Sequence, residues 1–372
     1  MQRQCLNWSP PAALAALLLL ACVANTGPPK PLPDDVVTAW KQAGAQYDFG
    51  SGVSIIIQGE GSFGRKQATA QYDFFYGPKP LFYFDTWQKG RLAKLPAPAS
   101  AFGLDLANTQ VMDEGLKELA GLKNLTRLNL AKKKVTSVGL KELAGLTNLQ
   151  ELNLSQTEVT GAGLKELAGL TNLQKLNLGG TQLTGAGLKE LAKLKNLQWL
   201  NLGGTQVTSA GLKELTGLKW LNLSHTQVSD AGLKELSGLK SLQELALNGT
   251  QVTDAGLKDL AGLTSLQELD LGKTQVTGAG LKELAGLKNL QTLNLGGAKL
   301  TDAGLNGLAG LKSLTWLNLS QTEVTDAGTK ELFGLKSLNA LYLVDTKVTI
   351  VGLKGLKGAL RECRIWLKPP PK

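Results

Sequence analysis

The chain has few of the residues on which most catalytic and metal sites depend. It contains one histidine and three cysteines among 372 residues, and no two cysteines stand in a CxxC spacing. A zinc site built from the usual Cys and His ligands is therefore not expected. The sequence also lacks a nucleophile elbow, a phosphate-cradling loop and a metal-ligand cluster, so we expect no catalysis, no cofactor and no metal.

Aromatic residues are also scarce, at 5% of the chain, while the formal net charge is +10 from 40 Lys and Arg against 30 Asp and Glu. A basic chain can bind nucleic acid or an anionic membrane. Nucleic-acid binding usually needs a stripe of Lys and Arg interleaved with aromatic residues. Here the lysines are spread evenly and mixed with glutamates, so we expect a solvated surface and no nucleic-acid partner.

The N-terminus has the features of an export signal. The run from Ala12 to Ala21 is apolar but about half as long as a membrane span. It ends in Leu19-Leu20-Ala21-Cys22, which resembles a bacterial lipobox, and this resemblance implies that Cys22 is acylated and anchors the protein to a membrane. We therefore expect a signal peptide over 1–21 and a proline-rich tether over 22–33. An ordinary signal peptide, an uncleaved anchor and a cytoplasmic protein are the alternatives.

Residues 34–99 do not repeat and are expected to form a small α+β module. Acidic residues at Asp34 and Asp35 open a short helix, and Gly44 ends it. Three segments rich in Ile, Phe and Tyr predict strands, at Val53–Ile57, Ala70–Tyr76 and Leu81–Trp87. The first unit of a repeat protein exposes an apolar end, so we expect this module to cover it. A separate ligand-binding domain is the alternative.

The rest of the chain repeats a Leu-x-Leu unit at a nearly constant step. The first leucine stands at 104, 128, 152, 176, 200, 221, 245, 269, 293, 317 and 341, and Ile365 continues the series. One unit runs LALNGTQVTDAGLKDLAGL from Leu245 to Leu263. This pattern resembles the leucine-rich-repeat family, in the form found in exported or cell-envelope proteins of bacteria. The resemblance implies an α/β solenoid with parallel strands on the concave face and short helices on the convex face, over 100–350, followed by a cap and tail at 351–372.

Within a unit, each residue type has a structural role. Leu245 and Leu247 alternate with Ala246, which predicts a strand with one buried and one open face. Thr250 is expected to satisfy backbone groups in the bend after the strand. Two units lack this threonine, at Lys133 and Ala298, so looser bends are expected there.

The second half of a unit predicts a helix on the outer side. Thr253 is expected to cap a helix that starts at Asp254, and Gly262 is expected to end it in a left-handed conformation. One unit is shorter than the others, with its deletion at Gly217–Trp220, which removes one buried leucine. A local irregularity in curvature is expected at this unit.

The concave face is where a ligand site is expected. An asparagine stands between the two leucines of most units and is expected to form a ladder that is partly self-satisfied. The residue before the first leucine varies, and Trp199 and Trp220 occupy this position in adjacent units, as an exposed platform. The alternative is that these tryptophans fill the space left by the shorter unit. The residues expected to bind ligand are Trp199, Trp220, Asn201, Asn222, Glu244, Trp316 and Tyr342.

These observations predict a non-enzymatic, monomeric binding scaffold displayed at the cell envelope, or secreted, with a protein or glycan on its concave face. One alternative, by analogy with repeat proteins that present substrates to ubiquitin ligases, is a substrate-presenting adaptor of a ubiquitin-ligase-like complex. The segment from Leu32 to Val36 looks like the opening of an F-box, but we treat this match as a coincidence. The strand-like segment from Phe49 to Tyr83 argues against that helical module. The other alternative is a structural spacer without a specific ligand.

Overall fold

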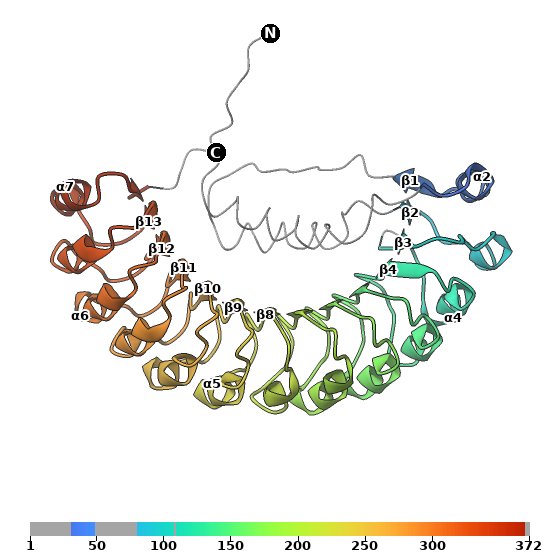
Figure 1. The fold of residues 1–372 in the computed structure, drawn as a ribbon, viewed down its shortest axis with the longest axis horizontal. Helices are drawn as coiled ribbons and strands as arrows, with labels where there is room; N and C mark the ends of the chain where they lie inside the picture. Colours follow the sequence, from blue (N-terminus) through green and yellow to red (C-terminus); the bar gives the residue numbers. More distant parts are fainter. Residues whose placement is uncertain (1–30, 49–79, 108, 369–372) are drawn as a thin grey trace, which may run out of the picture.

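The computed structural model describes residues 31–48, 80–107 and 109–368, and these form a curved solenoid (Figure 1). A single sheet of 14 strands lines the inner side of the arc, with the strands in chain order from β1 to β14. Short helices lie on the outer side. The expected α/β leucine-rich-repeat solenoid, with strands inside and helices outside, is confirmed. None of the helices in the described part of the chain is both long and apolar enough to cross a bilayer.

The repeat strands pair in parallel, and their leucines stay in register. Leu152 pairs with Leu176, and Leu176 pairs with Leu200, so each step along the sheet brings equivalent residues together. The strands are β3 (Phe102–Asp105), β4 (Leu125–Asn129), β5 (Glu151–Asn153), β6 (Lys175–Asn177), β7 (Trp199–Asn201), β8 (Trp220–Asn222), β9 (Glu244–Ala246), β10 (Glu268–Asp270), β11 (Thr292–Asn294), β12 (Trp316–Asn318), β13 (Ala340–Tyr342) and β14 (Arg364–Trp366).

The N-terminal residues extend this sheet and cover its first repeat. The expected helix is present as α2 (Asp34–Gln42), followed by β1 (Gln46–Asp48), β2 (Leu81–Tyr83) and the 3-10 helix η1 (Leu92–Lys94). Strand β1 pairs antiparallel with β2, and β2 pairs parallel with β3.

An aromatic cluster joins this N-terminal segment to the repeats. Trp40 is fully buried, stacks on Phe82 with ring centroids 4.3 Å apart, and meets Phe102 of β3 edge-on at 5.8 Å. Its indole N–H donates to the carbonyl of Pro96 at 2.9 Å. These contacts cover the apolar end of the first repeat, as a cap would.

Two of the three expected N-terminal strands, Val53–Ile57 and Ala70–Tyr76, lie outside the described residues. The third, Leu81–Trp87, is a strand only over its first three residues. Within 31–48 and 80–101, α2 is the one α-helix and strands follow it, which is not the helical pattern of an F-box.

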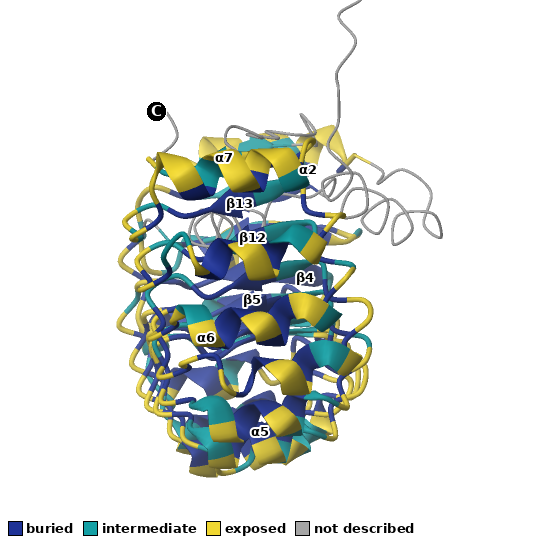
Figure 2. Cartoon of the chain, turned by 90° about the vertical axis from the view of Figure 1, so that its left-hand side faces the viewer, coloured by how far each residue is buried: buried dark blue, intermediate teal, exposed yellow. Residues whose placement is uncertain are grey.

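Most outer segments are 3-10 helices rather than α-helices. The segments are α4 (Asp113–Leu116), η2 (Lys117–Leu119), η3 (Gly139–Leu143), η4 (Gly161–Leu167), η5 (Gly185–Lys193), η6 (Leu212–Glu214), α5 (Asp230–Leu236), η7 (Asp254–Leu260), η8 (Leu281–Gly286), α6 (Asp302–Leu305), η9 (Asn306–Gly310), η10 (Gly328–Gly334) and α7 (Ile350–Ala359). Their burial pattern is seen in Figure 2, where exposed residues lie on the outer surface of each turn.

The prediction that Gly262 adopts a left-handed conformation is wrong. Gly262 does not have a positive φ, because the chain continues in tight turns there: Ala261 N–H donates to the Lys258 carbonyl, and Leu263 N–H donates to the Leu260 carbonyl. The left-handed residue of the repeat comes earlier, three residues after the last residue of the strand. Glycine fills this position at Gly249 (φ 67°), and His225 fills it with φ 57°.

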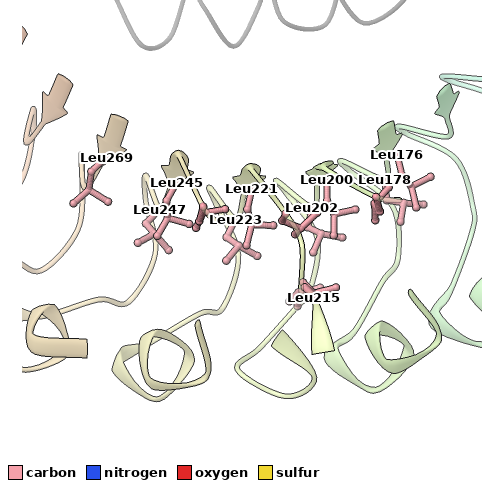
Figure 3. Close-up of a cluster of buried hydrophobic side chains, with 14 of the residues drawn as sticks. Leu176, Leu178, Leu200, Leu202, Leu215, Leu221, Leu223, Leu245, Leu247 and Leu269 are labelled. Atoms are coloured by element: carbon pink, nitrogen blue, oxygen red, sulfur yellow. The ribbon is translucent and has the colours of Figure 1, made fainter. Parts of the chain in front are cut away.

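The core is a continuous column of leucines between the sheet and the outer helices. Figure 3 shows leucines within or just after β6 to β10, such as Leu221 and Leu223, projecting toward the outer segments. Both of these side chains are fully buried, as is Leu245 in the next repeat. Each such side chain contributes about 1.5–3 kcal/mol when it is removed from water.

The threonine after each strand acts as expected. The Thr250 hydroxyl donates to the Leu247 carbonyl at 2.6 Å, and equivalent threonines repeat this bond. Among the two exceptions, the Lys133 ammonium donates instead to the carbonyl of Thr109 in the previous repeat. At Ala298 the backbone N–H still donates to the Leu295 carbonyl at 3.1 Å, so the bend keeps its turn without the hydroxyl.

Aspartates join the outer turns of neighbouring repeats. The Thr253 hydroxyl accepts from Ala255 N–H at 3.2 Å, so the expected cap is present. The same threonine donates its N–H and its hydroxyl to the carboxylate of Asp230, at 2.8 and 2.7 Å. Asp254 in turn accepts from Thr277 of the following repeat. The acidic residue therefore bonds to the next repeat and not to its own helix.

The shorter repeat leaves the sheet intact. Trp199 pairs with Trp220 in β7 and β8 without a register shift. The outer segment absorbs the deletion: η6 has three residues and is flanked by Gly211 (φ 82°) and Gly217 (φ 85°). The irregularity thus lies on the outer side of the solenoid.

Candidate functional site on the concave face

Two rows of side chains line the concave face, because strand residues alternate between faces. We call the residue before the central leucine of each strand the first row, and the residue after it the second row. Trp220, Leu221 and Asn222 of β8 illustrate the pattern: the leucine is fully buried, and the flanking residues lie on the opposite face.

The second row is a hydrogen-bonded ladder. Each asparagine oxygen accepts from the backbone N–H two residues later, as in Asn177 with Gly179 at 3.0 Å. Asn318 also donates its amide to the Asn294 oxygen at 2.9 Å. The expected partly self-satisfied ladder is therefore confirmed.

This ladder leaves less open surface than the sequence suggests. Asn222 is 8% exposed and Tyr342 is 6% exposed, whereas Asn201 is half-buried. The reason is the close strand spacing, at which neighbouring side chains cover one another. Asn201 and Asn222 each accept a backbone hydrogen bond, from Gly203 at 2.9 Å and Ser224 at 2.8 Å. Of the residues expected to bind ligand, these two also hydrogen-bond to the scaffold, and their part in binding stays a prediction.

Trp199 and Trp220 form the most prominent first-row feature. Their rings stack with centroids 4.1 Å apart and planes 7° from parallel. Both side chains are half-buried. Because the ring separation is close to the spacing of their strands, the ring planes stand roughly perpendicular to the sheet and face each other. They present their edges to the concave space instead of a flat platform.

A second aromatic cluster lies at the C-terminal end of the face. Trp316 of β12 meets Tyr342 of β13 at 5.3 Å, and Tyr342 stacks on Trp366 of β14 at 4.4 Å with planes 8° apart. The sequence singled out Trp316 and Tyr342 but did not include Trp366. Its position in the second row of the last strand is the signal that could have identified it.

Glu244 lies between the two clusters, in the first row of β9. It pairs in register with Trp220 on one side and with Glu268 of β10 on the other. Glu268 was not among the residues expected to bind ligand, although it occupies the same row.

Asp270 is a buried carboxylate in the second row of β10. It is 2% exposed and accepts from Gly272 N–H at 2.8 Å, Asn294 at 2.8 Å and Asn248 at 3.4 Å. Burial raises the pKa of Asp270 to about 6, although these hydrogen bonds act to lower it. The sequence shows an aspartate where most repeats have asparagine, and this departure is the signal that marks it.

The other potentially reactive side chains do not come together in one site. Cys363 is buried, and burial raises the pKa of its thiol to about 12, which keeps it protonated and unreactive. His225 is exposed on a turn after β8. In the described ranges, no three His, Cys, Asp or Glu side chains gather in a way that could hold a metal. Cys22, the expected lipid attachment point, lies outside the described residues.

Several solved structures share this fold. An internalin from Listeria monocytogenes aligns with a TM-score of 0.59 and 22% identity, covering 78% of this chain and 87% of its own. A TDR receptor aligns with a TM-score of 0.55 and 21% identity, covering 73% of this chain and 47% of its own. A plant peptide hormone receptor, RGFR1 in complex with RGF2, aligns with a TM-score of 0.51 and 19% identity, covering 78% and 50%.

No curated protein matches the sequence. The leucine-rich repeat family model matches six units in two blocks, residues 145–192 and 218–309. The unmatched stretch between the blocks contains most of the shorter repeat. The matched units are therefore leucine-rich repeats, and the chain is a solenoid of the leucine-rich-repeat fold.

Proposed function

We propose that this chain is a non-enzymatic binding protein that holds a protein ligand on its concave face. The observation that carries the proposal is the stacked pair of Trp199 and Trp220 in the middle of that face. Aromatic side chains that are partly open to solvent on a rigid sheet are typical anchors of protein interfaces. The buried leucine column beneath the sheet keeps them in place without help from a ligand.

The geometry of the pair favours a protein segment over a glycan. A sugar ring usually binds by lying against the face of an aromatic ring. One face of each indole is covered by the other indole, because their planes are 7° from parallel and 4.1 Å apart. A ridge of ring edges suits the irregular side chains of a protein better than the flat face of a sugar ring.

We also propose that the protein is exported and anchored in a bacterial cell envelope through a lipid on Cys22. Support comes from the lipobox-like Leu19-Leu20-Ala21-Cys22 and from the proline-rich segment that follows it. The sole cysteine in the described residues, Cys363, is buried and does not compete for acylation. A display role is consistent with a rigid, elongated solenoid held away from its anchor by a short tether.

The binding role is tested by comparing the full-length protein with two double variants. W199F/W220F keeps an aromatic stack, whereas W199A/W220A removes it. We expect one or more envelope proteins to be captured by the wild type and W199F/W220F but lost with W199A/W220A, and each captured protein to bind directly when purified. Equal capture by all three forms would contradict the proposal and favour a structural spacer.

The anchor is tested separately by metabolic labelling with palmitate. Labelling is expected to disappear in C22S and to persist in C363S, with C22S released from the membrane fraction. Persistent labelling of C22S would exclude acylation at this cysteine. Labelling in neither form would favour an ordinary cleaved signal and a secreted protein.

A further inference from the structure

Helix α7, the last outer helix, begins with two adjacent apolar side chains that are open to solvent. Ile350 is 69% exposed and Val351 is 74% exposed. Within residues 31–48, 80–107 and 109–368, the other large apolar residues with such exposure are Met112 and Val138, which stand singly on separate repeats. Single exposed apolar residues are ordinary on protein surfaces, so the adjacent pair on α7 is the one that needs an explanation.

Packing within the solenoid does not explain why these two positions are apolar. Inner repeats hold aspartate and alanine there, as in Asp254 and Ala255. Asp254 bonds to the outer turn of the following repeat, whereas no outer turn follows α7 in the described part of the chain. The Thr349 hydroxyl accepts from Val351 N–H at 3.1 Å, so the first turn of α7 is held by its cap and not by the two apolar side chains.

The same face of α7 carries two lysines. Lys354 and Lys357 follow Ile350 by four and seven residues, which places all three on one side of the helix. Both lysines are exposed, and neither belongs to an ion pair within the described residues. Inner turns usually place an acidic residue directly after the lysine, but α7 has Gly355 there. The exposed face of this helix is therefore both apolar and basic.

The surroundings of α7 do not neutralise this face. Residues 326–368 contain eight positively charged side chains and four carboxylates. Of those carboxylates, Asp326 already accepts from the N–H and the hydroxyl of Thr349, at 2.7 and 2.6 Å. At the other end of the helix, the Lys336 ammonium donates to the Ala359 carbonyl at 2.9 Å, which adds a positive charge.

The position of α7 leaves this face accessible. The helix lies at the C-terminal end of the arc (Figure 1), and its exposed residues face away from the sheet (Figure 2). Gly358 follows Lys354 by four residues and lies on the same face. A Cβ at Gly358 would meet nothing within 4 Å, so packing does not require glycine at this position. The missing side chain lets the helix backbone come close to a flat surface.

We propose that α7 docks on an anionic phospholipid bilayer. Ile350 and Val351 enter the boundary between headgroups and acyl chains, and the two lysines lie at the level of the lipid phosphates. Helices that bind membrane surfaces combine an apolar contact with lysines in this way, and each lysine strengthens the attraction to anionic lipid. A second copy of the chain is a poorer occupant, because two such faces would bring four lysines together.

The test measures binding of the full-length C22S protein to vesicles by co-sedimentation. C22S cannot be acylated at that cysteine, so the contact is separated from the proposed lipid anchor. Vesicles of phosphatidylglycerol mixed with phosphatidylcholine offer an anionic surface, and vesicles of phosphatidylcholine alone offer a neutral one. All forms share the apolar run from Ala12 to Ala21, so any binding through it is the same in each. The gain from neutral to anionic vesicles is the quantity compared.

Two variants in this background remove the two parts of the contact. I350D/V351A gives α7 the aspartate and alanine of the inner repeats, and K354Q/K357Q removes two positive charges. Each should weaken binding to the anionic vesicles about tenfold or more. The matched controls, V138A and K234Q/K258Q, alter an exposed valine and two exposed lysines of inner repeats, and each should change binding less than about twofold.

The outcomes that would overturn the inference are distinct from those for concave-face binding. Equal binding by the C22S parent and both α7 variants would overturn it, as would equal binding to neutral and anionic vesicles. A loss with K234Q/K258Q as large as that with K354Q/K357Q would show a general electrostatic attraction and would also overturn it. A dimer in the absence of vesicles that I350D/V351A dissociates would assign the face to a second copy instead.

Discussion

Two aspartates in consecutive repeats, one on the inner face and one on the outer turns, show how differently the two sides of the solenoid use the same side chain. Asp270 sits in the buried ladder of β10, where burial raises its pKa to about 6. Burial also acts to raise the pKa of Asp254 on the outer turn. Hydrogen bonds from Thr277, Gly280 and Gly278 outweigh that effect and lower it.

The difference lies in what each carboxylate receives. Asp254 accepts from the Thr277 hydroxyl at 2.6 Å and from three backbone N–H groups of the next repeat. Its charge therefore braces the junction between repeats. Asp270 occupies a position where asparagine makes the same backbone bond in most other strands. Stability accounts for the outer aspartate but not for the inner one, because burial disfavours the charged form of Asp270.

The largest effect is expected from D270N. Because the folded pKa of about 6 exceeds the unfolded value, the folded state binds the extra proton between about pH 4 and 6, and stability falls as pH rises through this window. D270N removes this loss and should raise the free energy of unfolding near pH 7.5 by up to about 3 kcal/mol. Denaturant unfolding of both proteins across this pH range measures it.

The reciprocal substitution N153D is the control for D270N. Asn153 is as buried as Asp270 in the same ladder, and its side chain carries no charge. A new carboxylate there should lower stability near neutral pH and recover it in acid. Parallel pH profiles for the wild type and D270N would show that Asp270 is not the source of the pH dependence.

A smaller effect, a loss of about 2 kcal/mol in the free energy of unfolding, is expected from D254N, because the amide can accept fewer of the four hydrogen bonds and brings a donor against other donors. The charged form of Asp254 is the stabilising one, so its contribution is present above the unfolded pKa and lost as pH falls below it. Hydrogen exchange at Thr277 N–H, with D259N on the same turn as the control, measures the loosened junction. Unchanged protection of that amide would contradict the stabilising role of Asp254 at the junction between repeats.

The sequence predicted the solenoid because one leucine spacing, repeated along the chain, admits a single way to bury all of those side chains. The fully buried Leu221 and the threonine bond at Thr250 follow directly from that pattern. The sequence could not predict that Asp254 bonds to the following repeat, since this depends on how neighbouring turns stack. The left-handed position was missed because residues such as His225 fill it as well as glycine.

The candidate site was predictable in location but not in geometry. Equivalent positions in adjacent repeats placed Trp199 beside Trp220, as the structure shows. Whether the rings lie flat or stack upright depends on side-chain torsions that spacing does not determine. The burial of Asn222 was missed for a related reason, because it results from the side chains of neighbouring strands covering one another.

A loss of about 1 kcal/mol is expected from W220A, which removes one partner of a half-exposed stack. If the tryptophans instead filled the space left by the shorter repeat, W220A would open a cavity and cost about 3–5 kcal/mol. Denaturant unfolding therefore distinguishes a binding ridge from a space-filling pair. W220F, which keeps an aromatic ring in place, should remain close to the wild type.

The smallest effect on stability is expected from E244Q, within about 0.5 kcal/mol of the wild type, because Glu244 is a half-buried first-row residue next to the like charge of Glu268. A nearly unchanged unfolding free energy would show that Glu244 does not hold the scaffold together. A loss of stability comparable to that of D254N would contradict this, because Glu244 on the inner face and Asp254 on the outer turn would then both stabilise the fold.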